Sequence, residues 1–208
     1  MNNILILAAD IVNGSNYCKQ LIPIHGKPVI SLVLDSFKSD YIYIVCNSKN
    51  LLLLNYLSNV YKNVNIIIID EKLEIDKYNS FTILNSFYKG LSYIKQNDRF
   101  WSRKKLILNF GDTLVTDIPD ITGDLLISSK NVLSPGRWTI GNIIDNKLKS
   151  IFDKRKDIEI KDNEAFVGYF QFVSVNFLYD IVDFSNLDLS ETTSISLKSK
   201  FEKSSASA

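Results

Sequence analysis

Short apolar runs alternate along the first half of the chain with segments whose apolar residues recur every three to four positions. The runs of strand length cover residues 4–9, 41–47, 63–70 and 104–115, and the helix-like segments cover residues 27–37, 48–61 and 80–94. Candidate N-caps are Ser48 and Ser80 for the last two helices. Strands that are apolar on both faces and alternate with helices predict a parallel sheet covered on both sides.

The pattern changes in the second half. Residues 137–154 alternate apolar and polar positions around Asp145 and Asn146, which is typical of a β-hairpin. Residues 164–175 predict a further strand, and residues 176–182 predict a short helix. We therefore expect an α/β fold with a Rossmann-like, mostly parallel mixed sheet flanked by helices, and with an antiparallel second half.

The length of 208 residues and the hydrophobic content of 46% suit one core better than two. We expect one domain over residues 1–183. Residues 184–208 are rich in serine and threonine and carry too little apolar surface to order themselves, which predicts a flexible segment. An additional C-terminal domain in a longer natural chain, or a second copy of this chain, stays open as a partner.

Composition excludes several classes of partner. The formal net charge is +1, with 24 basic and 23 acidic residues mixed along the chain, so there is no electrostatic footprint for nucleic acid or an anionic membrane. The apolar runs are too short to span a bilayer. Cys18 and Cys46 have neither a disulfide framework nor metal-ligand spacing, which favours a reducing compartment, with the cytoplasm as the expected location.

Two polar residues stand where α/β folds collect their ligands. Lys19 lies on the loop between the first strand and the first helix, and Asp112 follows Gly111 at the end of the fourth strand. A solvated lysine and a turn aspartate are the alternative interpretations of these two residues. His25 and Lys27 are expected to form a turn before the helix, with no catalytic role.

Four segments together resemble the nucleotidyltransferases that make nucleoside-diphosphate sugars and related activated alcohols. These segments are LILAAD, CKQLIPIHGKPVI, NFGDTLV, and KLKSIFDK followed by FVGYFQF, in the order and spacing of that family over roughly residues 3 to 180. The resemblance implies a GT-A-like fold and an enzyme that transfers a nucleoside monophosphate from a nucleoside triphosphate to a sugar phosphate or phospho-alcohol, with release of pyrophosphate. It also implies a role in the synthesis of capsule or another surface polysaccharide.

The resemblance assigns the catalytic roles residue by residue. Lys19 matches the lysine that reaches the triphosphate, and Lys154 matches the lysine that contacts the phosphate of the acceptor. Asp112 matches the aspartate that holds Mg²⁺, the implied cofactor. This chemistry needs positioning and charge neutralisation rather than a covalent nucleophile.

The remaining assignments concern binding. Asp153, in place of the family's glutamate, and Gly168 are implied to contact the acceptor. Asn79 and Ser80 are candidate contacts for the base and ribose, although helix capping explains Ser80 equally well. The other implied nucleotide-binding residues are Leu7, Ala8, Ala9 and Gly111.

The loop after the first strand departs from the family pattern. Asp10 replaces a glycine, Cys18 replaces a proline, and no arginine occurs before Arg99. A carboxylate about 4 Å from a phosphate charge costs on the order of 4 kcal/mol at an effective dielectric near 20, unless a metal ion lies between them. The family's second acidic ligand, in an Asp-x-Gly segment, does not occur after Gly168.

These departures keep two other functions open. One is a non-catalytic module of the same fold that binds a nucleotide or sugar phosphate without turnover. The other is a glycosyltransferase of related fold, which ranks last because the segment GDTLV lacks the second acid of an Asp-x-Asp pair.

Overall fold

The computed structural model describes residues 2–9, 18–37, 41–70, 72, 83–118, 120–130, 138–145, 147–153 and 163–182. The expected domain end at residue 183 and the polar segment 184–208 lie outside these residues.

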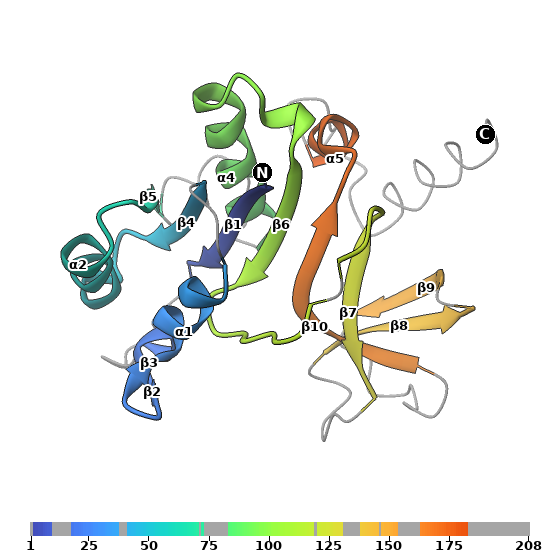
Figure 1. The fold of residues 1–208 in the computed structure, drawn as a ribbon, viewed down its shortest axis with the longest axis horizontal. Coiled ribbons are helices and arrows are strands. Elements are labelled where there is room, and N and C mark those ends of the chain that lie inside the picture. Colours follow the sequence, from blue (N-terminus) through green and yellow to red (C-terminus); the bar gives the residue numbers. More distant parts are fainter. Residues whose placement is uncertain are drawn as a thin grey trace.

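Eight strands from the described residues form one mixed sheet at the centre of the fold (Figure 1). Its parallel half consists of β5 (Asn65–Ile69), β4 (Ile42–Asn47), β1 (Asn2–Ala8) and β6 (Lys105–Phe110), in this spatial order. Its antiparallel half consists of β10 (Asn163–Phe172), β8 (Thr139–Ile144), β9 (Lys147–Asp153) and β7 (Leu125–Ser129). The predicted α/β fold, with its change of strand direction in the second half, is confirmed.

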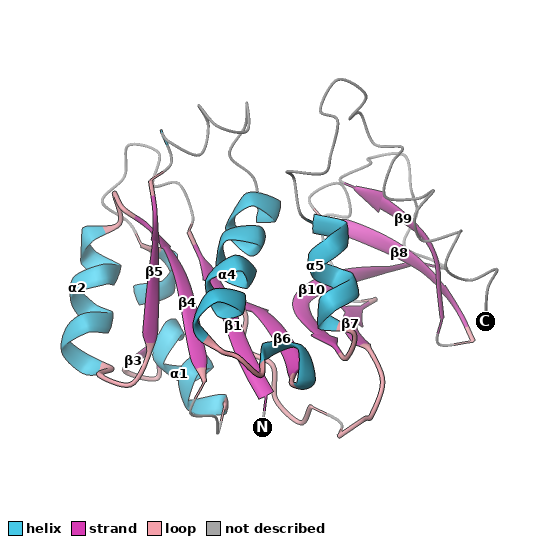
Figure 2. Cartoon of the chain, turned by 90° about the horizontal axis from the view of Figure 1, so that it is seen from above, coloured by secondary structure: helices cyan, strands magenta, loops and turns pink. Residues whose placement is uncertain are grey.

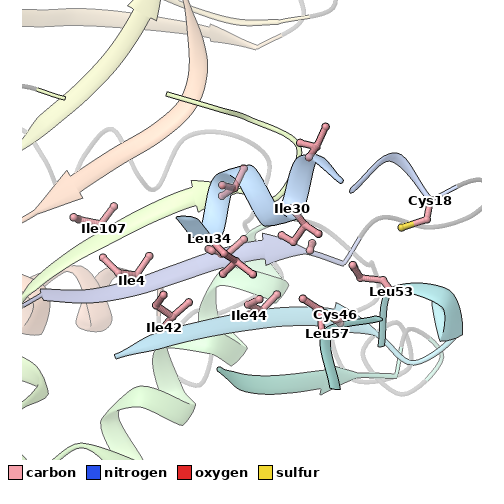
Figure 3. Close-up of a cluster of buried hydrophobic side chains, with 14 of the residues drawn as sticks. Ile4, Cys18, Ile30, Leu34, Ile42, Ile44, Cys46, Leu53, Leu57 and Ile107 are labelled. Atoms are coloured by element: carbon pink, nitrogen blue, oxygen red, sulfur yellow. The ribbon is translucent and has the colours of Figure 1, made fainter. Parts of the chain in front are cut away.

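Helices cover both faces of the parallel half (Figure 2). Ile4, Ile6 and Ala8 of β1 face α1 (Val29–Ser36) and α2 (Leu51–Val60) in one apolar cluster (Figure 3). The alternate residues Leu5 and Leu7 face α4 (Ile83–Asn97) and α5 (Val175–Val182) in a second cluster. None of the described helices is long and apolar enough to cross a membrane.

Local details differ from the sequence-based expectations in the N-cap of α2 and in three strands that were not predicted. The N-cap of α2 is Asn50 rather than Ser48, because the Asn50 side chain accepts a hydrogen bond from the Leu53 backbone N–H at 3.3 Å. The sequence pattern missed β7 and the short hairpin of β2 (Pro23–Ile24) and β3 (Lys27–Pro28). The expected N-cap Ser80 lies outside the described residues.

The β2–β3 hairpin confirms the predicted turn. His25 and Gly26 connect the two strands with φ angles of 49° and 81°, both in the left-handed region that two-residue hairpin turns require. The only histidine of the chain therefore has a structural role in this turn, directly before α1.

β10 joins the two halves of the sheet. Phe170 pairs with both β6 and β7, and Ala165 pairs with both β7 and β8. β6 and β8 therefore follow one another along the same side of β10, and β7 lies along the other side. The pairing of β10 with β7 shifts between Phe166 and Phe170, so the irregular part of β10 is the part that passes from one half of the sheet to the other.

A buried ion pair holds the amino edge of the parallel strands. The Lys104 ammonium lies 2.7 Å from the Asp98 carboxylate, and the two side chains are only 11% and 8% exposed. Asp98 also accepts hydrogen bonds from the Asn3 amide at 3.2 Å and the Phe100 backbone N–H at 2.9 Å. Burial alone would raise the pKa of the Asp98 carboxyl, but these hydrogen bonds and the Lys104 charge lower it below its usual value.

We predict that Lys104→Met lowers the free energy of unfolding by about 3 kcal/mol, because it leaves the Asp98 carboxylate buried without its counter-charge. Urea denaturation at pH 7 measures this change. Because the pKa of Asp98 is depressed in the folded protein, its contribution is present above about pH 4, near the unfolded value, and is lost as pH falls through the folded pKa.

Lys27→Met is the matched control. Its partner Asp35 is 3.5 Å away, and both side chains are more than half exposed, so removing this pair should change stability by less than about 0.5 kcal/mol. Equal effects of the two lysine substitutions would show that the buried pair contributes nothing beyond a surface contact.

Candidate functional site

The carboxyl ends of β1 and β6 meet directly. The Gly111 backbone N–H donates a hydrogen bond of 2.9 Å to the Leu7 carbonyl oxygen. A Cβ atom on Gly111 would lie only 2.9 Å from the Ala8 Cβ and 3.4 Å from the Gln20 Cγ. Only glycine therefore allows the ends of β6 and β1 to pack this closely, and the Gln20 side chain lies beside that glycine.

This contact brings two predicted site residues to one edge of the sheet. Lys19 precedes the buried Gln20 in the short 3₁₀ helix η1 (Lys19–Leu21), and Asp112 follows Gly111. Both Lys19 and Asp112 are exposed, whereas the neighbours that anchor them are buried. An ammonium and a carboxylate thus stand on adjacent pieces of backbone at the carboxyl edge of the parallel strands, where α/β folds bind ligands.

Asn109 fixes the turn that carries Asp112. The turn closes with a hydrogen bond of 3.1 Å from the Thr113 backbone N–H to the Phe110 carbonyl. The buried Asn109 side chain donates to the carbonyls of Phe110 and Thr113, at 2.8 and 2.9 Å. Sequence analysis missed this residue, although a polar side chain in the otherwise apolar run before Gly-Asp was a usable signal.

Gly168 lies beside the end of β6. Its φ angle is 87°, and an added Cβ would lie 2.5 Å from the Phe110 ring. Backbone conformation and the aromatic neighbour therefore already require glycine here, and the expected contact with substrate stays a prediction. Asp153 is the last residue of β9, and its backbone pairs with Thr139 of β8. The neighbouring residue Ile140 pairs with Ala165, so Asp153 lies near the part of β10 just before Gly168.

Several predicted site residues lie outside the part of the chain that the structure describes. These are Lys154, Asn79, Ser80 and Asp10, together with the Asp153 side chain. Their roles stay predictions. Leu7, Ala8 and Ala9 are buried at the end of β1, with exposed fractions of 8%, 1% and 8%.

Asp112 fits magnesium only in part. No group of three His, Cys, Asp or Glu side chains in the described part of the chain is arranged to hold a metal. Mg²⁺ usually takes one or two carboxylates and completes its shell with phosphate oxygens and water. An exposed Asp112 is a suitable oxygen ligand of this kind, so a metal ion here would bind together with the phosphates of a ligand.

The cysteines do not offer a nucleophile. Burial, with a smaller contribution from the neighbouring Cys18, raises the pKa of the Cys46 thiol to about 12. Both cysteines are buried and neither forms a disulfide. This is compatible with chemistry that proceeds by charge neutralisation and positioning.

Comparisons with known proteins support the fold. No protein-family model and no curated protein matches the chain. The solved structure of the inositol-1-phosphate CTP transferase from T. maritima matches with a TM-score of 0.59 and 16% identity, over 89% of this chain and 74% of that one.

Two further structures match over most of both chains. HddC from Yersinia pseudotuberculosis has a TM-score of 0.57 and 16% identity, over 93% of this chain and 87% of that one. The 4-diphosphocytidyl-2C-methyl-D-erythritol synthase has a TM-score of 0.55 and 10% identity, over 97% of this chain and 85% of that one. The chain therefore shares the fold of these proteins, at identities that establish the fold alone.

We predict that Gly168→Ala destabilises the protein by about 3 kcal/mol, because a side chain at positive φ is strained and its Cβ would overlap the Phe110 ring. Denaturation in urea measures the change. Gly123→Ala is the control, since an added Cβ there meets no atom within 4 Å. If both substitutions were equally mild, the packing of β10 on Phe110 would not require glycine.

Proposed function

We propose that the chain is a nucleotidyltransferase that transfers a nucleoside monophosphate from a nucleoside triphosphate to a phosphorylated sugar or alcohol and releases pyrophosphate. The observation that carries this proposal is the contact of Gly111 with the Lys19 loop and the end of β1, which gathers an ammonium and a carboxylate at the ligand-binding edge of the sheet. The shared fold with a CTP transferase supports it.

CTP is the nucleotide that we propose. The T. maritima neighbour is described as a CTP transferase for inositol-1-phosphate, and the name of the synthase contains a diphosphocytidyl group on methylerythritol. Both names refer to a cytidine nucleotide and to a polyol that carries phosphate. A sugar phosphate or polyol phosphate is therefore the acceptor class that we propose, with use of the product in surface polysaccharide synthesis.

The reaction brings two anions together. An oxygen of the acceptor phosphate attacks the α-phosphorus, a new P–O bond forms, and the bond from the α-phosphorus to the bridging oxygen breaks as pyrophosphate leaves. Lys19 binds and orients the triphosphate with its ammonium group. Magnesium held by Asp112 would neutralise phosphate charge when bound.

The ends of β1 and β6 contribute mostly backbone. The Leu7 carbonyl is already engaged by the Gly111 N–H, so Leu7 supports the site, while the small side chains of Ala8 and Ala9 allow a nucleotide to approach the end of β1. We assign the acceptor phosphate to Lys154, with Asp153 beside it, and the base and ribose to Asn79 and Ser80.

One observation favours a second candidate function. No arginine precedes Arg99, so the loop after β1 offers no guanidinium to the leaving pyrophosphate. A module that binds the nucleotide without transferring it would need no such group. The experiment below separates the two functions.

Pyrophosphate release with CTP, Mg²⁺ and a panel of sugar phosphates and polyol phosphates tests the proposal. We expect turnover with at least one acceptor, and a loss of about 100-fold or more in kcat/KM for Lys19→Met and for Asp112→Asn, because each removes charge that stabilises the transition state. Lys27→Met and Asp120→Asn, at exposed positions away from the contact, should retain activity.

The outcomes differ for each function. CTP binding by calorimetry without pyrophosphate release from any acceptor would favour the binding module. Full activity of both Lys19→Met and Asp112→Asn would show that the reaction takes place elsewhere in the molecule.

A further inference from the structure

The Cys18 thiol lies between two buried carboxamides, from Gln20 and Asn50. Its S–H donates to the Gln20 Oε1 at 3.3 Å, and its sulfur accepts from the Asn50 Nδ2 at 3.4 Å. The exposed fractions of Cys18, Gln20 and Asn50 are 7%, 2% and 4%. Figure 3 shows Cys18 at the α2 end of the apolar cluster. These three side chains, which we call the thiol network, are shielded from water.

One end of the thiol network is anchored in a helix. The Asn50 side chain caps α2 through its hydrogen bond from the Leu53 N–H, and the Leu54 N–H bonds the Asn50 carbonyl at 3.1 Å. Leu53 and Leu57 hold this helix in the core with no exposed surface. The Asn50 amide that reaches Cys18 is therefore fixed on its other side by the first turn of α2.

The other end reaches the Asp112 turn. The Gln20 Cγ lies 3.4 Å from the position of a Cβ on Gly111, so the Gln20 side chain fills the space beside that glycine. The thiol network thus spans from the start of α2, through the loop after β1, to the end of β6.

Lys19 lies in the middle of this connection. Its two neighbours in the chain, Cys18 and Gln20, both belong to the thiol network. The 3₁₀ helix η1 itself is a single short turn. It is held by hydrogen bonds from the Leu21 N–H to the Cys18 carbonyl at 3.0 Å and from the Ile22 N–H to the Lys19 carbonyl at 3.2 Å. Such short 3₁₀ turns have poor hydrogen-bond geometry. A lysine on a flexible four-carbon stem needs a fixed backbone to direct its ammonium group.

We infer that the thiol network fixes the backbone of Lys19 toward the bound triphosphate, and that Cys18 is a positioning residue for the proposed reaction. This inference rests on the proposed function for the identity of the ligand. A buried cysteine commonly acts only as a small apolar side chain, but here its sulfur has a donor on one side and an acceptor on the other.

The first experiment measures CTP affinity by calorimetry in four variants and in the Lys19→Met reference. Cys18→Ala removes both hydrogen bonds, and Asn50→Ser removes the amide donor to the sulfur while keeping a side-chain oxygen as acceptor for the Leu53 N–H. We expect each to weaken CTP binding about threefold to tenfold, the usual range for one hydrogen bond. Cys18→Ser keeps a donor and an acceptor and should bind CTP nearly as well as the unchanged protein.

The fourth variant separates positioning from general loosening. In a Lys19→Met background, adding Cys18→Ala should leave CTP affinity unchanged, because the network acts through Lys19. A further loss of affinity in that background would overturn the inference, since Cys18 would then support the site independently of Lys19.

The second experiment needs no ligand. Amide hydrogen exchange at Leu21 and Ile22, whose N–H groups hold η1, should become about tenfold faster in Cys18→Ala and in Asn50→Ser, but not in Cys18→Ser, while exchange at Leu53 stays constant in the Cys18 variants. Unchanged exchange at Leu21 and Ile22 would overturn the inference. Failure to release pyrophosphate with any acceptor would instead overturn the proposed function, and exchange and CTP affinity would still decide the role of the network.

Discussion

The hydrogen bond from the Gly111 N–H to the Leu7 carbonyl is the contact on which the candidate site depends. It continues the pairing of β1 and β6 by one residue beyond the strand, into the turn before Asp112. Because glycine has no Cβ, this turn can lie against the end of β1, with the Gln20 side chain from the loop that carries Lys19 beside it. A Cβ on residue 111 would overlap the Ala8 Cβ, so a bulkier residue would push the turn that carries Asp112 away from the end of β1.

Buried amide side chains fix the backbone on both sides of this contact. Asn109 holds the carbonyls on both sides of Asp112, and Asn50 ties the start of α2 to Cys18. Both amides donate through Nδ2, and a buried donor is costly to leave without an acceptor, so each favours the local conformation that supplies one. Gln20 connects the two regions through its contacts with Cys18 and Gly111. Rigid support of this kind is what phosphoryl transfer requires, because its catalysis consists mostly of positioning.

The two edges of the parallel half have different tasks. At the amino edge, the paired Asp98 and Lys104 are buried and hydrogen-bonded, which suits a structural role. At the carboxyl edge, Lys19 and Asp112 are exposed on short turns. β10 adds the antiparallel half beside this carboxyl edge, since Gly168 packs on Phe110 where β6 ends. The buried ion pair that stabilises the fold and the charged residues of the proposed site therefore lie at opposite ends of the parallel strands.

Hydrophobic periodicity is a local property, and by itself it determined most of the elements. These are the apolar runs of β1, β4, β5 and β6, the helices between them, and the Asp145 hairpin. Lys19 and Asp112 were chosen from their places after strands and from the resemblance. Only the tertiary structure decided the roles of Asn109 and Asn50, the pairing of β7, and the conformation that requires glycine at residue 168. These depend on contacts between residues far apart in the chain, such as 18 with 50 and 7 with 111, which exist only after the strand order brings them together.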